Sequence, residues 1–177
     1  MAVRELLFIG DERLYRLAEK VDFNDPELPQ NIQDLTDSNL HYGGSGLAAP
    51  QIGINKQIIR FGFEHNPRYP EEKPVPITIL INPEFEILEE EPFVKWEGCY
   101  CIPYYRGKVA RPRKIRYWGF DENKNRIERI AENFHAKVFQ HEYDHLQGIL
   151  YPLRLKNLKD NFWYEKAQLS KKILEEA

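Results

Sequence analysis

Apolar residues recur at near-helical spacing in the first part of the chain, between residues 25 and 41. They stand three to five positions apart, at Leu28, Ile32, Leu35 and Leu40. This spacing places apolar side chains along one face of a helix. Two consecutive glycines at positions 43 and 44 then interrupt the pattern. Because glycine is common where helices end, we expect a helix over 25–41 followed by a glycine-rich loop.

Short segments rich in β-branched and aromatic residues predict strands in the middle of the chain. Bounded by proline, glycine and asparagine, they cover residues 57–64, 77–82, 85–89 and 114–121. Residues 121–125 are typical of a hairpin turn, which leads into a further strand over 126–131. The segment 66–76 contains four prolines, which a central strand does not tolerate. We interpret it as an exposed insertion.

The clearest helix is predicted over residues 133–146. Asn133 is a candidate N-cap, and Gly148 occupies the position at which a helix stops. The apolar stripe of this helix advances by four, three and four positions, through Phe134, Val138, His141 and His145. Both histidines therefore lie on the face turned toward the core. A last helix is expected from about 158 to 175.

The composition is that of one ordered globular domain. The 177 residues are 42% hydrophobic and 30% charged, and a chain of this length fits a single domain over residues 1–177. The net charge of −3 gives no general attraction to nucleic acid or to anionic membranes. No apolar run approaches the ~18 residues that span a bilayer, and the N-terminus does not resemble a signal peptide. We therefore expect a soluble cytoplasmic protein.

Residues 141–145 read His-Glu-Tyr-Asp-His. Two histidines four positions apart on a helix project one turn apart, so both can bind one tetrahedral metal ion. Glu142 would then lie beside a metal-bound water molecule. The alternative is that both histidines are ordinary core residues, which the predicted helix around the motif makes less favoured.

A hydrolytic metal site needs a third protein ligand and an open position, and Cys99 is the candidate. Cys101 leaves an alternative open. In an extended backbone both thiols point to one side, so Cys99, Cys101, His141 and His145 could form a closed structural zinc site. Glu142 favours the open site, because a structural site needs no carboxylate beside its ligands. A disulfide between the cysteines would be strained, which fits a reducing compartment.

Two further segments have both a functional and a structural interpretation. Residues 43–53 combine glycines with Gln51, so their backbone could approach a ligand closely, or they could form only a tight turn. A basic cluster could bind an anionic partner, but we interpret it as the solvated face of a strand pair. It consists of Arg106, Lys108, Arg111, Arg113, Lys114 and Arg116.

Three segments together, 44–51, 97–99 and 140–148, resemble the signature motifs of peptide deformylases. The resemblance implies an α+β fold, with antiparallel sheets packed around a central metal-binding helix and a C-terminal helix. It implies a metal-dependent hydrolase that removes the formyl group from N-formylmethionine of nascent polypeptides and releases formate. Ferrous iron is the expected metal, with zinc, nickel or cobalt as substitutes. The expected partners are nascent peptides, with a transient ribosome contact and neither nucleic acid nor membrane.

The same resemblance implies roles for single residues. Cys99, His141 and His145 correspond to the metal ligands. Glu142 corresponds to the general base and acid that takes a proton from the attacking metal-bound water and returns it to the leaving amine. Gln51 corresponds to a group that holds the formyl oxygen.

The backbone N–H of Tyr100 corresponds to the second group that holds the formyl oxygen. Weaker correspondences complete the expected site: Gly46 would lend its backbone to the peptide, and Leu47 would line the pocket. Arg111 would pair with Glu97.

Tyr100 and Cys101 stand where the family usually has leucine and serine. They keep two other hypotheses open, a weak or inactive deformylase-like protein with the closed zinc site, and a zinc peptidase that cleaves internal bonds.

Overall fold

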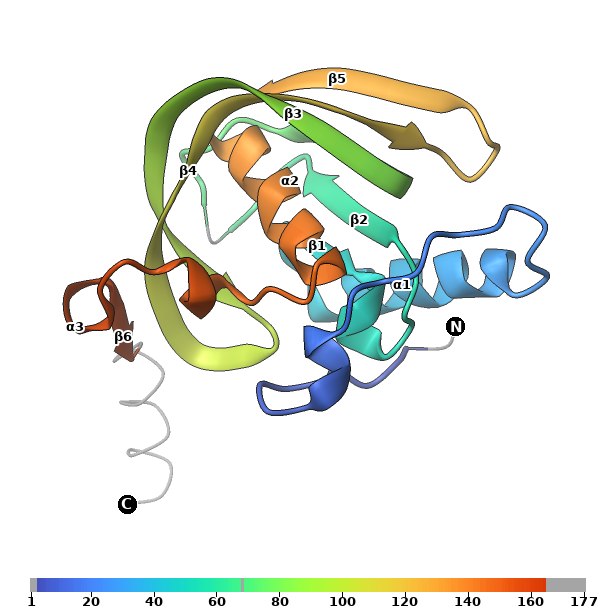
Figure 1. Cartoon of the computed structure of the whole chain (residues 1–177), viewed down its shortest axis with the longest axis horizontal. Helices are drawn as coiled ribbons and strands as arrows, with labels where there is room; N and C mark the ends of the chain where they lie inside the picture. Colours follow the sequence, from blue (N-terminus) through green and yellow to red (C-terminus); the bar gives the residue numbers. More distant parts are fainter. Residues whose placement is uncertain (1–2, 68, 165–177) are drawn as a thin grey trace.

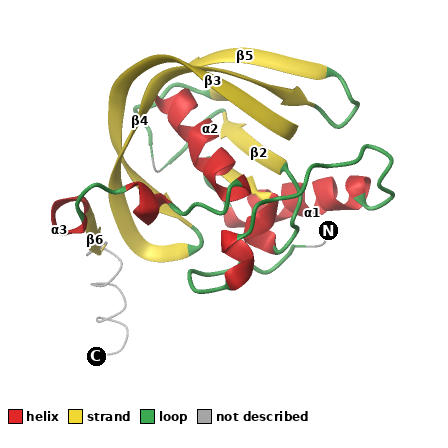
Figure 2. Cartoon of the chain, viewed as in Figure 1, coloured by secondary structure: helices red, strands yellow, loops and turns green. Residues whose placement is uncertain are grey.

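The computed structural model describes residues 3–67 and 69–164. Within these residues the chain forms a six-stranded sheet that curves around a central helix (Figures 1 and 2). The strand order is β1-β2-β3-β4-β5, with β6 beside β4, and all these pairs are antiparallel. The predicted α+β class is confirmed.

The strands are β1 (Gly46–Ala48), β2 (Ile58–Phe63), β3 (Val75–Cys99), β4 (Ile102–Phe120), β5 (Arg126–Glu132) and β6 (Phe162–Tyr164). The α-helices are α1 (Leu28–Tyr42), α2 (Asn133–Leu146) and α3 (Leu158–Asn161). Three 3-10 turns, η1 (Glu12–Tyr15), η2 (Ala49–Ile52) and η3 (Tyr151–Arg154), complete the described elements. Among the described residues, no helix is long and apolar enough to cross a membrane.

Strands β3 and β4 form one long hairpin that arches over α2 (Figure 1). The prediction of separate strands at 77–82 and 85–89 was wrong, because Pro83, which divided them, lies inside β3. Pro83 falls at a register shift, and Pro92 lies opposite Pro112 on β4. A proline cannot donate to the ladder, so a strand tolerates it at such irregularities. Next to the hairpin turn, at residues 100–101, Cys99 contacts His145 of α2.

Helix α2 has the predicted bounds, and the four residues of its predicted stripe are buried. Its cap differs from the prediction. The N-cap position is Glu132, no side chain caps the helix, and Asn133 has a left-handed φ of 52°. Gly148 ends the helix as predicted, with a φ of 68°. On the core side the Phe139 ring stacks on Tyr117 of β4, with centroids 4.5 Å apart.

Helix α1 begins at Leu28, three residues later than predicted. Asp25 instead accepts a hydrogen bond from the Glu27 backbone in the preceding turn, as aspartate commonly does. Leu28 and Leu35 are buried, but Leu40 is 66% exposed. Leu40 therefore does not belong to the buried face.

Two further predicted segments are partly confirmed. The described residues of the insertion 66–76 form a loop at 66–67 and 69–74, but Asn66 is buried and the Tyr69 ring packs on Phe134 with centroids 4.9 Å apart. The C-terminal helix begins at Leu158 as predicted and ends at Asn161, where the chain turns into β6. The rest of the predicted helix, 165–175, lies outside the described residues.

Candidate metal centre

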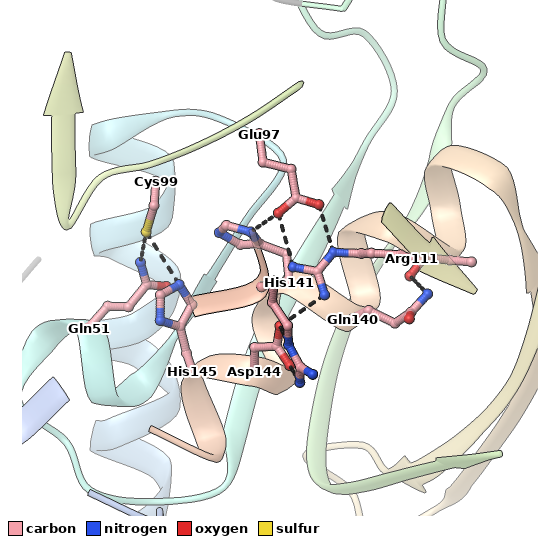
Figure 3. A network of polar contacts seen from close by, with 10 residues as sticks. Gln51, Glu97, Cys99, Arg111, Gln140, His141, Asp144 and His145 are labelled. Carbon is pink, nitrogen blue, oxygen red and sulfur yellow. Dashed lines mark hydrogen bonds and ion pairs between the residues drawn. The ribbon is translucent and has the colours of Figure 1, made fainter. Parts of the chain in front are cut away.

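Three potential metal ligands meet between the β3–β4 hairpin and α2. Cys99 is the last residue of β3, and His141 and His145 project from adjacent turns of α2 (Figure 3). Their ligand atoms all lie within 4.8 Å of one another. The Sγ atom of Cys99 is 3.3 Å from Nε2 of His145.

The spacing and chemistry of these atoms fit a divalent metal ion. In a tetrahedral site with bonds of ~2.3 Å to sulfur and ~2.0 Å to nitrogen, these two ligand atoms stand about 3.5 Å apart. Burial lowers the pKa of both histidines, so both are neutral, as metal ligands must be. The hydrogen bond with Cys101 and burial raise the pKa of the Cys99 thiol, so its thiolate needs a nearby cation.

A buried carboxylate orients His141. Nδ1 of His141 donates to Oε2 of Glu97 at 2.8 Å, which leaves Nε2 for the metal. Glu97 is itself completely buried and accepts two hydrogen bonds from Arg111, at 2.6 and 3.0 Å. Burial alone would raise the pKa of Glu97, but Arg111 and its other neighbours hold it well below its usual range. Such a partner fixes the imidazole's tautomer and orientation.

Arg111 connects this pair to a second carboxylate. Its Nη1 donates to Asp144 at 2.9 Å (Figure 3). Asp144 also accepts two hydrogen bonds from Arg154 of η3. The expected pairing of Arg111 with Glu97 is present. The interpretation of the basic cluster as a solvated face is wrong for Arg111, which is 4% exposed. Sequence reasoning missed Asp144 and Arg154, although Asp144 follows His141 at a helical step of three.

Glu142 is buried beside the ligands and has an unused oxygen. Its side chain lines a cavity of about 190 Å³, and within the described structure Oε2 has no hydrogen-bond partner. Burial raises the pKa of Glu142 to about 8. A Cβ atom at Gly46 would lie only 2.6 Å from Oε1 of Glu142. Glycine therefore allows β1 to lie directly against this carboxylate.

Of the other residues predicted to form the site, Gln51 and Tyr100 line the cavity and Leu47 does not. Gln51 is buried, lines the cavity, and donates through Nε2 to the sulfurs of Cys99 and Cys101 at 3.5 and 3.4 Å. Tyr100 lines the cavity, and its hydroxyl donates to the Tyr42 carbonyl. Leu47 instead packs completely buried in the core and does not line the cavity. Strand β1 places Leu47 in the core while Gly46 faces Glu142.

Cys101 lies in the hairpin turn and outside the group of ligand atoms. Cys99 pairs with Ile102 across this turn, so the backbone between the cysteines is not the extended strand that the closed zinc site assumed. Cys101 belongs to a buried apolar cluster with Leu14 and Val109. This geometry favours the open site.

Replacing Cys101 by serine should therefore leave one metal ion bound per chain. Serine keeps a small side chain that can accept the hydrogen bond of Gln51, while a metal held by three other residues loses no ligand. Metal content by atomic emission after dialysis measures the effect, with Cys99→Ser as the variant that should lose the ion. Loss of the metal from the Cys101→Ser protein would contradict the three-ligand site.

The fold and the site together define a class of proteins. Two imidazoles from a His-Glu-x-x-His helix lie beside a thiol from a neighbouring strand, and an unpaired carboxylate faces the cavity next to them. This arrangement is typical of metal-dependent hydrolases. The family model described as polypeptide deformylase matches residues 3–161. This chain belongs to that family and is a hydrolase.

Relatives and solved structures agree with this assignment. Peptide deformylase 2 of Ralstonia nicotianae is 49% identical over 156 residues, which cover 88% of each chain. Peptide deformylase 1 of Bordetella pertussis is 50% identical over 157 residues, covering 88% of this chain and 89% of the relative. The class I type b peptide deformylase of Acinetobacter baumannii, solved with Met-Ala-Ser bound, has a TM-score of 0.82 at 30% identity, covering 87% of this chain and 99% of that one.

Proposed function

We propose that this protein removes the formyl group from N-formylmethionine at the start of nascent polypeptides and releases formate. The observation that carries the proposal is the unpaired carboxylate of Glu142 in the cavity that Cys99 and His141 also line. Cys99, His141 and His145 would hold a divalent metal, ferrous iron first, with zinc, nickel or cobalt as substitutes. Such an ion supplies a Lewis acid that polarises the formyl oxygen and lowers the pKa of water.

Glu142 performs the proton transfers in this proposal. Its carboxylate takes a proton from a water molecule as the water oxygen bonds to the formyl carbon. When the bond between the formyl carbon and nitrogen breaks, Glu142 returns the proton to the departing amine. A pKa near neutrality suits a group that must both accept and release a proton.

Gln51 and the backbone N–H of Tyr100 hold the formyl oxygen. Negative charge builds on this oxygen as the water attacks, and fixed donors in a buried site stabilise that charge. Oε1 of Gln51 accepts a hydrogen bond from Ala48 N at 2.8 Å, which orients the amide, and Nε2 would exchange a contact with the sulfurs of Cys99 and Cys101 for one with the formyl oxygen.

The peptide binds along β1. Strand β1 pairs with β2 on one side, and Gly46 lines the cavity beside Glu142. Backbone groups of Gly46 can pair with such a chain as an added strand. The bound Met-Ala-Ser of the Acinetobacter relative is a peptide that begins with methionine. The chain works as one catalytic domain in the cytoplasm, on peptides leaving the ribosome.

Formate release from formyl-Met-Ala-Ser tests the proposal. We expect rapid release by protein purified anaerobically and loaded with ferrous iron, and none after the metal is removed by chelation. An internal peptide bond in a blocked peptide without a formyl group should remain intact, which separates this function from that of a peptidase. Absence of formate with folded, metal-loaded protein would contradict the proposal and favour the inactive, closed zinc site.

A further inference from the structure

Lys137 is a buried cation that the proposed mechanism does not use. It lies one helical turn before His141 on α2, is 6% exposed, and lines the cavity. Its ammonium is 5.0 Å from the ring centroid of Phe134 and 5.4 Å from that of Tyr69. Two aromatic faces therefore cradle the charge at the wall of the active site.

No carboxylate in the described part of the chain forms a direct ion pair with this ammonium, although the buried Glu97 and Glu142 lie close enough to interact with it electrostatically. Lys137 forms no hydrogen bond there either, and its ammonium packs directly against the two aromatic rings. Arg111, equally buried, instead contacts two carboxylates. Attraction to aromatic faces offsets only part of the cost of removing an ammonium from water. The part of this desolvation cost that the rings do not offset favours binding of an anionic group beside Lys137.

The other charges of the cavity favour the same kind of ligand. Among its described lining residues, Glu142 is the one carboxylate, and it is assigned to proton transfer. Arg106 adds a second cation to the lining, and its guanidinium lies over Gly98, where a Cβ atom would be 2.3 Å from Nη1. The described lining therefore holds two cations and one carboxylate, so as a set it attracts an anionic group more than a cationic one.

We propose that Lys137 is a specificity-determining residue, which binds an anionic side chain on one of the two residues that follow the formylated residue. This inference rests on the proposed function. Lys137 and His141 are four positions apart in α2, which corresponds to about 6 Å along the helix axis. For an extended peptide that runs alongside α2 and advances about 3.3 Å per residue, this distance corresponds to about two residues beyond the formyl group. Aspartate or glutamate there would supply the missing counter-charge.

The test compares matched pairs of formylated peptides. Formyl-Met-Glu-Ser is measured against formyl-Met-Gln-Ser, and formyl-Met-Ala-Glu amide against formyl-Met-Ala-Gln amide, as kcat/KM for formate release. In the wild-type protein the acidic member of one pair should be preferred about tenfold, because a buried charge pair is desolvated and direct. Lys137→Met keeps the aliphatic stem and should reduce this ratio to about one, whereas Lys137→Arg should preserve it.

Lys95→Met is the matched control. Lys95 also approaches an aromatic ring, 5.7 Å from the centroid of Phe93, but its side chain is 45% exposed and already pairs with Glu72 at 2.8 Å. Its replacement should leave the ratio unchanged. If Lys137→Met fails to fold, product inhibition of the wild type still decides. Met-Glu-Ser should then inhibit more strongly than Met-Gln-Ser, or Met-Ala-Glu amide more strongly than Met-Ala-Gln amide.

The outcomes separate the two proposals. Equal rates for both members of each pair in the wild-type protein would overturn the role of Lys137 while leaving deformylation intact. A preference that survives in Lys137→Met would overturn it too. Formate release from none of the four peptides would instead contradict the proposed function itself.

Discussion

Glutamine in place of Glu142 should lower kcat for formate release by roughly 10²–10⁴-fold while one metal ion stays bound per chain. Glutamine matches glutamate in size, so it still fits against Gly46, but it cannot accept the proton of the attacking water. The Oε2 atom of Glu142 has no partner in the described structure, so the substitution breaks no hydrogen bond of that atom. The expected loss therefore falls on the chemistry and not on folding.

The measurement combines steady-state kinetics, metal analysis and thermal unfolding of the same preparation. Glu122→Gln provides the control, because Glu122 is exposed in the turn between β4 and β5 and should retain full activity. A Glu142→Gln protein that keeps most of its kcat would show that another group transfers the proton.

Methionine in place of Arg111 should lower the free energy of unfolding by about 3–5 kcal/mol. Glu97 is completely buried, and its recorded polar contacts are those with Arg111 and His141. Removing the guanidinium leaves a buried carboxylate without its counter-charge, which costs far more than an exposed ion pair contributes. The change should also loosen His141, so metal affinity should fall with stability.

Urea unfolding of the metal-free and metal-loaded proteins measures both effects. Arg113→Met is the matched control, since Arg113 is 40% exposed and lies 3.4 Å from Glu91, so its loss should cost less than about 1 kcal/mol. The double variant with Glu97→Gln should be less destabilised than the two single changes predict together, because they share one interaction. Additive costs would show that the pair does not act as a unit.

Sequence patterns predicted the elements whose formation depends on local residues. The bounds of helix α2 were predicted correctly from the spacing of its apolar residues and from Gly148. The same spacing correctly placed both histidines on the buried face. The pattern could not show that β3 continues through Pro83 and Pro92, because the partner strand that accommodates these prolines lies elsewhere in the chain. Pairing with β4 determines where β3 ends, and the strand preferences of the individual residues do not.

The site was predicted to the extent that it lies in short motifs. His141, Glu142 and His145 share one helix, so their relation follows from helical geometry. The different surroundings of Cys99 and Cys101 depend on the hairpin turn, which alternation along an extended strand could not reveal. Lys137 was missed because a lysine in an apolar stripe is ordinarily taken as an exposed residue.

The position of Cys99 at the end of the β3–β4 hairpin also bears on how the chain holds together. A metal bound by Cys99 and His145 joins residues 46 positions apart. It would restrict the unfolded chain much as a disulfide does, and closing a loop of this length corresponds to about 4 kcal/mol of chain entropy. In a reducing compartment, where disulfides rarely persist, the catalytic ion would then serve as the molecule's reversible cross-link. Activity and conformational integrity would depend on the same bond.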